Sequence, residues 1–166
     1  LVPNEAPHAS RLIAAAERNG ATLIRFGRDA ACEARLIKFE MDETGSNAEA
    51  DILGRVIRYR VGVEGAHWAL NSVAALAAAD VVGADLDAAA FALEHLRAVD
   101  GRGVAAKVRA PFGEFTLVDD AYNANPASMA AAFATLSARK PGLGGRRIAA
   151  LGDMLELGPD ERAYHA

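Results

Sequence analysis

Two stretches of this chain alternate apolar and polar residues along their length. They are ARLIKFEMDE at residues 34–43 and GRVIRYRVG at residues 54–62. A period of two is typical of β-strands that bury one face and leave the other in water. The segment between them is rich in Gly, Ser and Asn, which favour turns. The pattern therefore predicts two antiparallel strands joined by that segment, with one solvated face.

Helical signals occupy three further stretches. The helices are expected at residues 7–20, 65–86 and 85–99. Pro7 suits the start of the first helix and Gly20 its C-terminal cap. The second has the strongest pattern, with small residues that allow close packing, and the third has Asp85 or Asp87 as its N-cap. A short apolar strand at residues 21–27 follows the first helix, and this order indicates α/β layering.

The pattern changes at DGRG, residues 100–103, where two glycines break the helical periodicity. We therefore place a domain boundary between Val99 and Arg102. Strands at residues 104–109 and 114–118 are predicted to form a hairpin across APFG.

A helix up to about Arg139 and a fully apolar strand, RIAAL at residues 147–151, are expected next. A strand–helix–strand order predicts a right-handed crossover and a parallel sheet. In such sheets ligands bind beyond the carboxyl ends of the strands. The fold class is therefore α/β.

The corner between the last hairpin strand and the following helix is unusually polar. Its sequence is DDAYNANPASM, from Asp119 to Met129. Carboxylates suit a ribose, a cation or a substrate ammonium group, and asparagine offers both donors and acceptors. Pro126 at the first helical position would make Asn125 an N-cap. A cap alone accounts for Asn125 but not for all the polar side chains, which are Asp119, Asp120, Tyr122, Asn123 and Asn125.

Three other places could bind a ligand, and each has a structural alternative. His67 and Asn71 are four residues apart and share a helix face, where a histidine is more often structural. Arg102 between glycines is sterically free to reach a phosphate, but a solvated linker arginine would have the same sequence. In GDMLELG, residues 152–158, Gly152 permits close backbone approach. Its acids, Asp153 and Glu156, equally suit the first turn of a following helix.

Composition narrows the class of protein. Hydrophobic residues make up 52% of the 166 residues and charged residues 24%, so a packed core is expected. The net charge of −4 argues against nucleic acid or an anionic membrane as the main partner. The single cysteine, Cys32, excludes an intramolecular disulfide, and a reducing cytoplasm is the expected location. The longest apolar run, residues 68–86, contains Asn71 and Asp80 and predicts a buried helix rather than a membrane span.

Several catalytic motifs are absent from these residues. There is no GxxxxGK followed by Ser or Thr to cradle phosphates, and no HExxH, CxxC or GxSxG. The chain lacks an initiator Met and ends just after a helix-like start, so we expect it to be a fragment. The residues by themselves predict an α/β protein that binds a polar ligand at the Asp119 loop.

Three stretches together resemble the Mur ligase family. They are GAHWALNSVAALAAA, then DGRG with LVDDAYNANPASMAAAF, then RRIAALGDMLELG. Their order and spacing cover residues 65–158. YNANP and LGDMLELG are characteristic of the family member that adds D-alanyl-D-alanine to UDP-N-acetylmuramoyl-tripeptide.

The resemblance implies a domain organisation. Residues 1–99 would form the second half of a P-loop-type ATPase domain, and residues 100–166 the first half of a Rossmann-like C-terminal ligase domain. The UDP-substrate domain, the P-loop, the metal-binding acids and a carbamylated lysine would lie upstream. No metal ligand is therefore expected within this chain.

The resemblance also implies a reaction with ATP and Mg²⁺ in peptidoglycan precursor synthesis. ATP would phosphorylate the terminal carboxylate of the peptide, and the amine of D-alanyl-D-alanine would attack the acyl phosphate. Catalysis of this kind is mainly positioning and charge neutralisation. Its partners would be the two substrates, with neither nucleic acid nor membrane insertion involved.

Site residues carry over by position in the matching motifs. His67 and Asn71 match the adenine side, although the family often has Asn where Trp68 follows His67. Arg102 matches a hinge arginine that approaches the phosphates when the domains close. The loop residues match two groups of family positions. One is an acidic pair near the ribose, and the other faces the cleft where the dipeptide and the nucleotide meet. The acidic pair is Asp119 and Asp120, and the cleft-facing residues are Tyr122, Asn123 and Asn125.

This resemblance implies two sets of functional residues. The nucleotide-binding set is His67, Asn71, Arg102, Asp119, Asp120 and Tyr122. The catalytic set is Arg102, Asn123 and Asn125. Two rival functions stay open: another amide ligase of the folylpolyglutamate synthase type, and a non-catalytic Rossmann-like ligand-binding module. YNANP argues against the first, and the missing phosphate cradle would suit the second if residues 1–166 were the natural chain.

Overall fold

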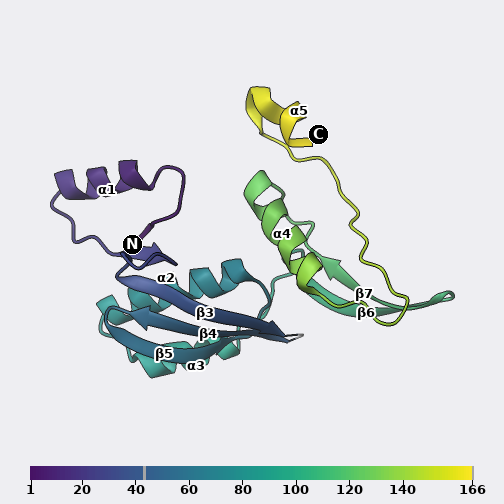
Figure 1. Cartoon of the computed structure of the whole chain (residues 1–166), viewed down its shortest axis with the longest axis horizontal. Helices are drawn as coiled ribbons and strands as arrows, with labels where there is room; N and C mark the ends of the chain where they lie inside the picture. Colours follow the sequence, from purple (N-terminus) through teal and green to yellow (C-terminus); the bar gives the residue numbers. More distant parts are fainter. Residues whose placement is uncertain (43, 166) are drawn as a thin grey trace. The chain divides into compact units, whose positions relative to one another are not determined.

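The strands of the first part of the chain form one mixed sheet in the computed structural model, which describes residues 1–42 and 44–165. Its order is β1-β2-β3-β4-β5, with parallel pairing from β1 to β3 and antiparallel pairing from β3 to β5 (Figure 1). The strands are β1 Val2–Pro3, β2 Arg25–Gly27, β3 Ala34–Asp42, β4 Gly45–Ile52 and β5 Arg55–Val61. Both alternating stretches are confirmed as strands, but they run in the same direction, because each pairs antiparallel with β4 between them.

The Gly/Ser/Asn segment is a strand, and its prediction as a connector was wrong. It forms β4, which pairs with both alternating stretches, so β3 and β5 do not pair with each other. A Cβ at Gly45 would collide with the carbonyl oxygen of Val61, so only glycine fits there. Ser46 is fully buried, and its hydroxyl donates to the Val63 carbonyl at 3.2 Å. Small residues are needed because the strand is packed at this point.

Two helices cover one face of this sheet. They are α2, Ala66–Val81, which packs on β3 and β4, and α3, Leu86–Glu94, which packs on β5 (Figure 1). Leu76 and Ile52 are almost fully buried between them and the sheet. Both helices were predicted from their apolar pattern. The N-cap of α3 is Asp85, whose carboxylate accepts the N–H groups of Asp87 and Ala88.

The first helix is confirmed with a small change at its end. It is α1, Ala9–Arg18, with Asn19 as C-cap. Gly20 follows the cap with φ 63°, the left-handed conformation that glycine takes at the end of a helix. No helix of the described residues is long and apolar enough to cross a membrane.

The chain divides into two compact units, residues 1–97 and 98–166. In the second unit, β6 Val104–Ala110 and β7 Gly113–Asp119 form the predicted hairpin, closed by Pro111 and Phe112. The remaining elements are α4 Pro126–Ala138, a 3-10 turn η1 Gly158–Asp160 and α5 Glu161–His165. The assignment of the two units to partial ATPase and ligase domains stays a prediction.

The strand expected at residues 147–151 does not form. Ile148 and Leu151 are 72% and 62% exposed, and the segment is irregular. A strand is stabilised by hydrogen bonds to a neighbouring strand, and the described residues bring none to this segment. The sheet of the second unit is therefore the antiparallel pair β6–β7, and the predicted parallel crossover is absent from the described residues.

The first-turn position that was one of two alternatives for the acids of GDMLELG does not occur. Asp153 and Glu156 precede the helix rather than starting it, and the first-turn acid of α5 is Glu161. Glu156 has φ 62°, which ends any regular element there. Met154 is the one buried residue described in the second unit. Its backbone N–H donates to Nε2 of His165 at 2.8 Å.

Candidate functional site

Arg102 and Tyr122 lie against each other in the second unit. The guanidinium carbon of Arg102 is 4.2 Å from the centroid of the Tyr122 ring. This is a cation–π contact, with both side chains exposed and Tyr122 at 67%. Among the described residues, no acceptor lies within hydrogen-bond distance of the Arg102 guanidinium. Its in-plane N–H groups are therefore available to an anion such as a phosphate.

The backbone on both sides of Arg102 is bonded to the polar loop. The Gly101 carbonyl accepts the Tyr122 N–H at 3.0 Å, and the Gly103 N–H donates to the Asp119 carbonyl at 2.8 Å. Gly101 and Gly103 have φ 73° and 81°, which non-glycine residues rarely adopt. The two glycines therefore allow the segment to lie against the loop, and Arg102 is not part of a loose linker.

The loop itself uses part of its polar capacity locally. Oδ1 of Asp119 accepts the Ala121 N–H at 3.1 Å, and Oδ1 of Asn123 accepts the Ala124 N–H at 2.9 Å. Asp120 has no such bond among the described residues, and all three side chains are exposed. The loop thus presents carboxylate and amide groups to solvent next to the Arg102–Tyr122 pair.

Asn125 is the N-cap of α4, as the sequence analysis predicted. Its Oδ1 accepts the Ser128 N–H at 2.9 Å, while Ser128 Oγ accepts the Asn125 N–H at 3.0 Å. This reciprocal capping box starts α4, with Pro126 at its first turn. A catalytic role for Asn125 is an addition to this function, and no measurement of the structure tests it.

His67 and Asn71 lie on the outer side of α2, in the first unit. Both are exposed, whereas Ala69, Ser72 and Val73 on the opposite side are buried. The shared face that their spacing predicted is therefore present. His67 also contacts the neighbouring indole, with ring centroids 5.6 Å apart.

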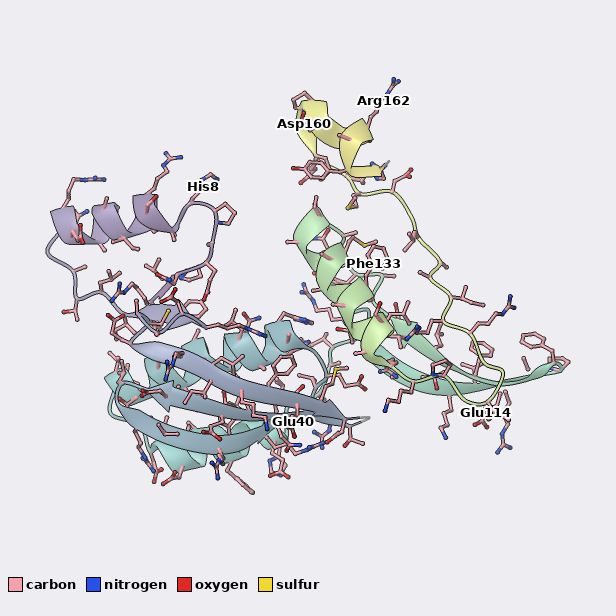
Figure 2. All side chains as sticks on the ribbon, in the orientation of Figure 1. His8, Glu40, Glu114, Phe133, Asp160 and Arg162 are labelled. Atoms are coloured by element: carbon pink, nitrogen blue, oxygen red, sulfur yellow. The ribbon has the colours of Figure 1, made fainter. Side chains whose placement is uncertain are left out.

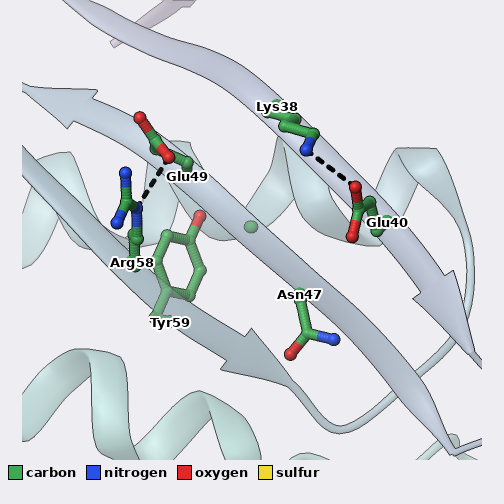
Figure 3. A pocket seen from close by; sticks show the side chains of 7 residues that line it. Lys38, Glu40, Asn47, Glu49, Arg58 and Tyr59 are labelled. Carbon is green, nitrogen blue, oxygen red and sulfur yellow. Dashed lines mark hydrogen bonds and ion pairs between the residues drawn. The ribbon is translucent and has the colours of Figure 1, made fainter.

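The sheet of the first unit carries a shallow depression of about 480 Å³ that contains none of the predicted residues (Figure 3). Lys38 pairs with Glu40 at 2.7 Å, and Arg58 pairs with Glu49 at 2.8 Å. The Lys38 ammonium group lowers the pKa of Glu40 by hydrogen bonding and charge. Because its charges are paired, we interpret this surface as the solvated face of the sheet, on which Glu40 is also labelled in Figure 2.

A second depression, of about 450 Å³, contains two arginines that the sequence analysis did not single out. Arg60 binds both carboxylate oxygens of Asp42 at 2.8 Å and holds the pKa of that carboxyl well below its usual range. Arg97 donates to the carbonyls of Glu94 and Leu96 and so closes the end of α3. These contacts are structural, and no spacing in the sequence indicates them.

The fit to the implied ligands differs between nucleotide and metal. The unpaired guanidinium of Arg102 suits a phosphate group. No group of three or more His, Cys, Asp or Glu residues that could hold a metal ion occurs within the described residues. Mg²⁺ therefore does not fit these residues by themselves.

Comparison with known proteins defines the class. Residues 105–166 match the family described as Mur ligase, glutamate ligase domain. The polar loop, its arginine and α4 all fall within or next to this match. Residues 105–166 therefore carry a Mur ligase family domain.

Two relatives of the chain have the same name. A UDP-N-acetylmuramoyl-tripeptide–D-alanyl-D-alanine ligase of Mycobacterium tuberculosis is 30% identical over 99% of this chain and 34% of its own length. The Escherichia coli K12 ligase of the same name is 42% identical over 61% of this chain and 21% of its own. The chain thus spans about a third or less of the relatives that it matches.

Solved structures of two named ligases superimpose on the chain. MurF from Acinetobacter baumannii superimposes with a TM-score of 0.85 and 26% identity, over 99% of this chain and 34% of that protein. Folylpolyglutamate synthase from Mycobacterium tuberculosis, complexed with ADP, has a TM-score of 0.65 and 28% identity, over 80% of this chain and 28% of its own. The α/β fold class is confirmed.

Proposed function

We propose that this chain is part of an ATP-dependent ligase that joins D-alanyl-D-alanine to UDP-N-acetylmuramoyl-tripeptide. The observation that carries the proposal is the likeness over 99% of the chain to a protein of that name. The exposed Arg102 cation beside the Asp119–Asn125 loop supports it, because a phosphate-transferring enzyme needs such a group. The protein would act in peptidoglycan precursor synthesis in the cytoplasm.

The proposed reaction has two steps. A peptide carboxylate is a poor electrophile, so one of its oxygens first takes the terminal phosphoryl group of ATP. This step forms an acyl phosphate and releases ADP. The amine of D-alanyl-D-alanine then attacks the acyl carbon, an amide bond forms, and inorganic phosphate leaves. Most of the catalysis is then positioning and electrostatic stabilisation.

Each residue of the site has a proposed part in this reaction. The flat guanidinium of Arg102 would hold phosphate oxygens by two parallel hydrogen bonds, which its planar geometry favours. Asn71, with His67, would contact the adenine. Asp119 and Asp120 would accept hydrogen bonds from the ribose. Asn123 and Asn125 would face the substrates, and Tyr122 lies beside Arg102.

The alternative is a ligase of the folylpolyglutamate synthase type, because the chain is also similar to an ADP-bound structure of that name. Its chemistry is also amide formation on a carboxylate, so only the substrates separate the two. YNANP favours the D-alanyl-D-alanine ligase.

The test has two parts. Reading the gene on both sides of residues 1–166 should show an upstream GxxxxGK followed by Ser or Thr; its absence would favour a non-catalytic module. The encoded protein should then release phosphate from ATP only with both UDP-N-acetylmuramoyl-tripeptide and D-alanyl-D-alanine. Phosphate release with a folate and glutamate instead would establish the alternative.

A further inference from the structure

We propose that Tyr122 is a positioning residue, which acts by holding the Arg102 guanidinium in place rather than by binding a substrate itself. This inference rests on the proposed function, in which Arg102 contacts phosphate. The observation behind it is the 4.2 Å separation between the guanidinium carbon and the tyrosine ring centroid.

The ring, rather than the hydroxyl, makes this contact. The Tyr122 hydroxyl has no hydrogen bond among the described residues, and 67% of the side chain is exposed. A guanidinium that stacks by its face keeps its N–H groups in the plane, where they can bind phosphate oxygens. Stacking therefore orients Arg102 without using the donors that the reaction needs.

The backbone places the two side chains together. The Gly101 carbonyl accepts the Tyr122 N–H at 3.0 Å, and a Cβ on Gly101 would lie 3.0 Å from the Tyr122 Cβ. The hydrogen bond between Gly101 and Tyr122 thus fixes the backbone next to Arg102 and at Tyr122. An arginine on an exposed segment otherwise samples many rotamers, and ordering it has an entropic cost. A ring fixed at this distance offsets part of that cost before any ligand binds.

Carboxylates do not compete for the same arginine. Asp119 and Asp120 lie in the same loop, but neither makes an ion pair with Arg102 within the described part of the chain. An ion pair would neutralise the cation and weaken its attraction for phosphate. An aromatic face gives orientation while it leaves the positive charge available.

The kinetic test uses the full-length protein and four variants. Tyr122→Leu removes the aromatic face, and we expect kcat to fall about two- to fivefold, the scale of one exposed cation–π contact. The KM for ATP should change less than twofold, because the arginine contact is used after binding. Tyr122→Phe should restore most of the lost rate. Tyr164→Leu, which removes another exposed tyrosine, is the matched control, and Arg102→Ala serves as the reference.

The double variant Arg102→Ala with Tyr122→Leu decides between the two roles. If the ring acts through the arginine, the double variant should be no slower than Arg102→Ala alone. Multiplied losses, or a Tyr122→Phe variant as slow as Tyr122→Leu with a raised KM for D-alanyl-D-alanine, would show that Tyr122 binds substrate directly and would overturn the proposal.

A spectroscopic measurement tests the pair independently of the reaction. In the ligand-free full-length protein, the Arg102 Nε–H proton should be shifted upfield by the tyrosine ring current in NMR spectra. The shift should persist in Tyr122→Phe and vanish in Tyr122→Leu. An unshifted Arg102 in a folded wild-type protein would refute the pairing, whereas failure of the ligase assay alone would refute only the proposed function.

Discussion

The two asparagines of the polar loop look equivalent in the sequence, yet their surroundings differ. Asn125 caps α4 through a reciprocal pair of bonds with Ser128. Among the described residues, the Asn123 side chain bonds only the N–H of the next residue. A residue that holds a helix contributes to stability whether or not it also contacts a substrate. The two positions can therefore be separated by measuring stability and activity together.

We expect Asn125→Ala to lower the free energy of unfolding by about 1 kcal/mol, the usual effect of losing an N-cap. Asn123→Ala should leave stability within about 0.5 kcal/mol. Asn123→Ala should nevertheless slow amide formation by the full-length protein about tenfold or more, which corresponds to ~1.4 kcal/mol. Asn125→Asp, which keeps the cap, is the control. Near-normal kinetics for both alanine variants would leave the loop without a catalytic role.

Glu33 provides a pH-dependent contribution to stability. Its carboxylate accepts hydrogen bonds from the Arg25 side chain and backbone, which lower its pKa from 4.5 to about 2. A carboxyl with a lowered folded-state pKa stabilises the protein above its unfolded pKa, and this contribution is lost as the pH falls towards about 2. The side chain is 39% exposed, so solvent screens the pair and the effect is small.

We therefore expect Glu33→Gln to weaken the pH dependence of unfolding between about pH 5 and pH 2. Urea titrations followed by Trp68 fluorescence would measure it. Arg25→Gln should reduce the pH dependence less, because it removes the guanidinium but keeps the backbone N–H that also donates to Glu33. An unchanged dependence in both variants would show that the pair contributes nothing.

Elements with a strong periodic pattern were predicted well, and elements defined by their neighbours were not. The helices α2 and α4 and the β6–β7 hairpin follow from local apolar pattern, caps and turn residues. The central strand β4 was missed because Gly45 and Ser46 have turn-like identities, and only packing against β5 explains them. The segment at residues 147–151 has a strand-like sequence, but no strand of the described residues pairs with it.

Gly45→Ala tests this account of β4. The new Cβ would meet the Val61 carbonyl oxygen, which is backbone and cannot rotate away. We expect a loss of roughly 1–3 kcal/mol in the free energy of unfolding, as for other overpacked sites. Gly54→Ala, at the β4–β5 turn, is the control. Gly54 also has a positive φ, but no atom lies within 4 Å of its added Cβ, so this variant measures the effect of losing such a glycine without a clash. A Gly45→Ala variant as stable as the wild type would contradict the packing argument.

The two units differ in how much of their surface they bury. Nearly all buried residues belong to residues 1–97, and Met154 is the buried residue described beyond them. Large apolar side chains of the second unit, such as Phe112 and Phe133, are 86% and 41% exposed. Figure 2 labels Phe133 on α4. The candidate site residues of both units are likewise exposed.

We expect residues 1–166 by themselves to have no ligase activity. Phosphoryl transfer needs a phosphate cradle of backbone N–H groups with a lysine, and a positioned metal ion. The sequence has no such cradle motif, and the described residues hold no metal-binding cluster. The measurement is phosphate release from ATP, Mg²⁺ and both substrates by the purified chain. Turnover of about 1 per second would contradict this prediction and the expectation that the phosphate cradle and metal ligands lie outside residues 1–166.

The sequence by itself determined most of the regular elements and supplied the candidate site residues. The composition of the Asp119 loop, the Asn125–Pro126 helix start and the two glycines around Arg102 are all local features, and local features are visible in a sequence. The family also follows from ordered motifs.

Only the tertiary structure decided which of these residues meet. The stacking of Arg102 on Tyr122 depends on two backbone hydrogen bonds between segments well separated in sequence. The place of β4 between β3 and β5 depends on the packing of Ser46 and Gly45. Pairings between distant segments are set by the sum of many weak contacts, and no short sequence pattern contains that sum.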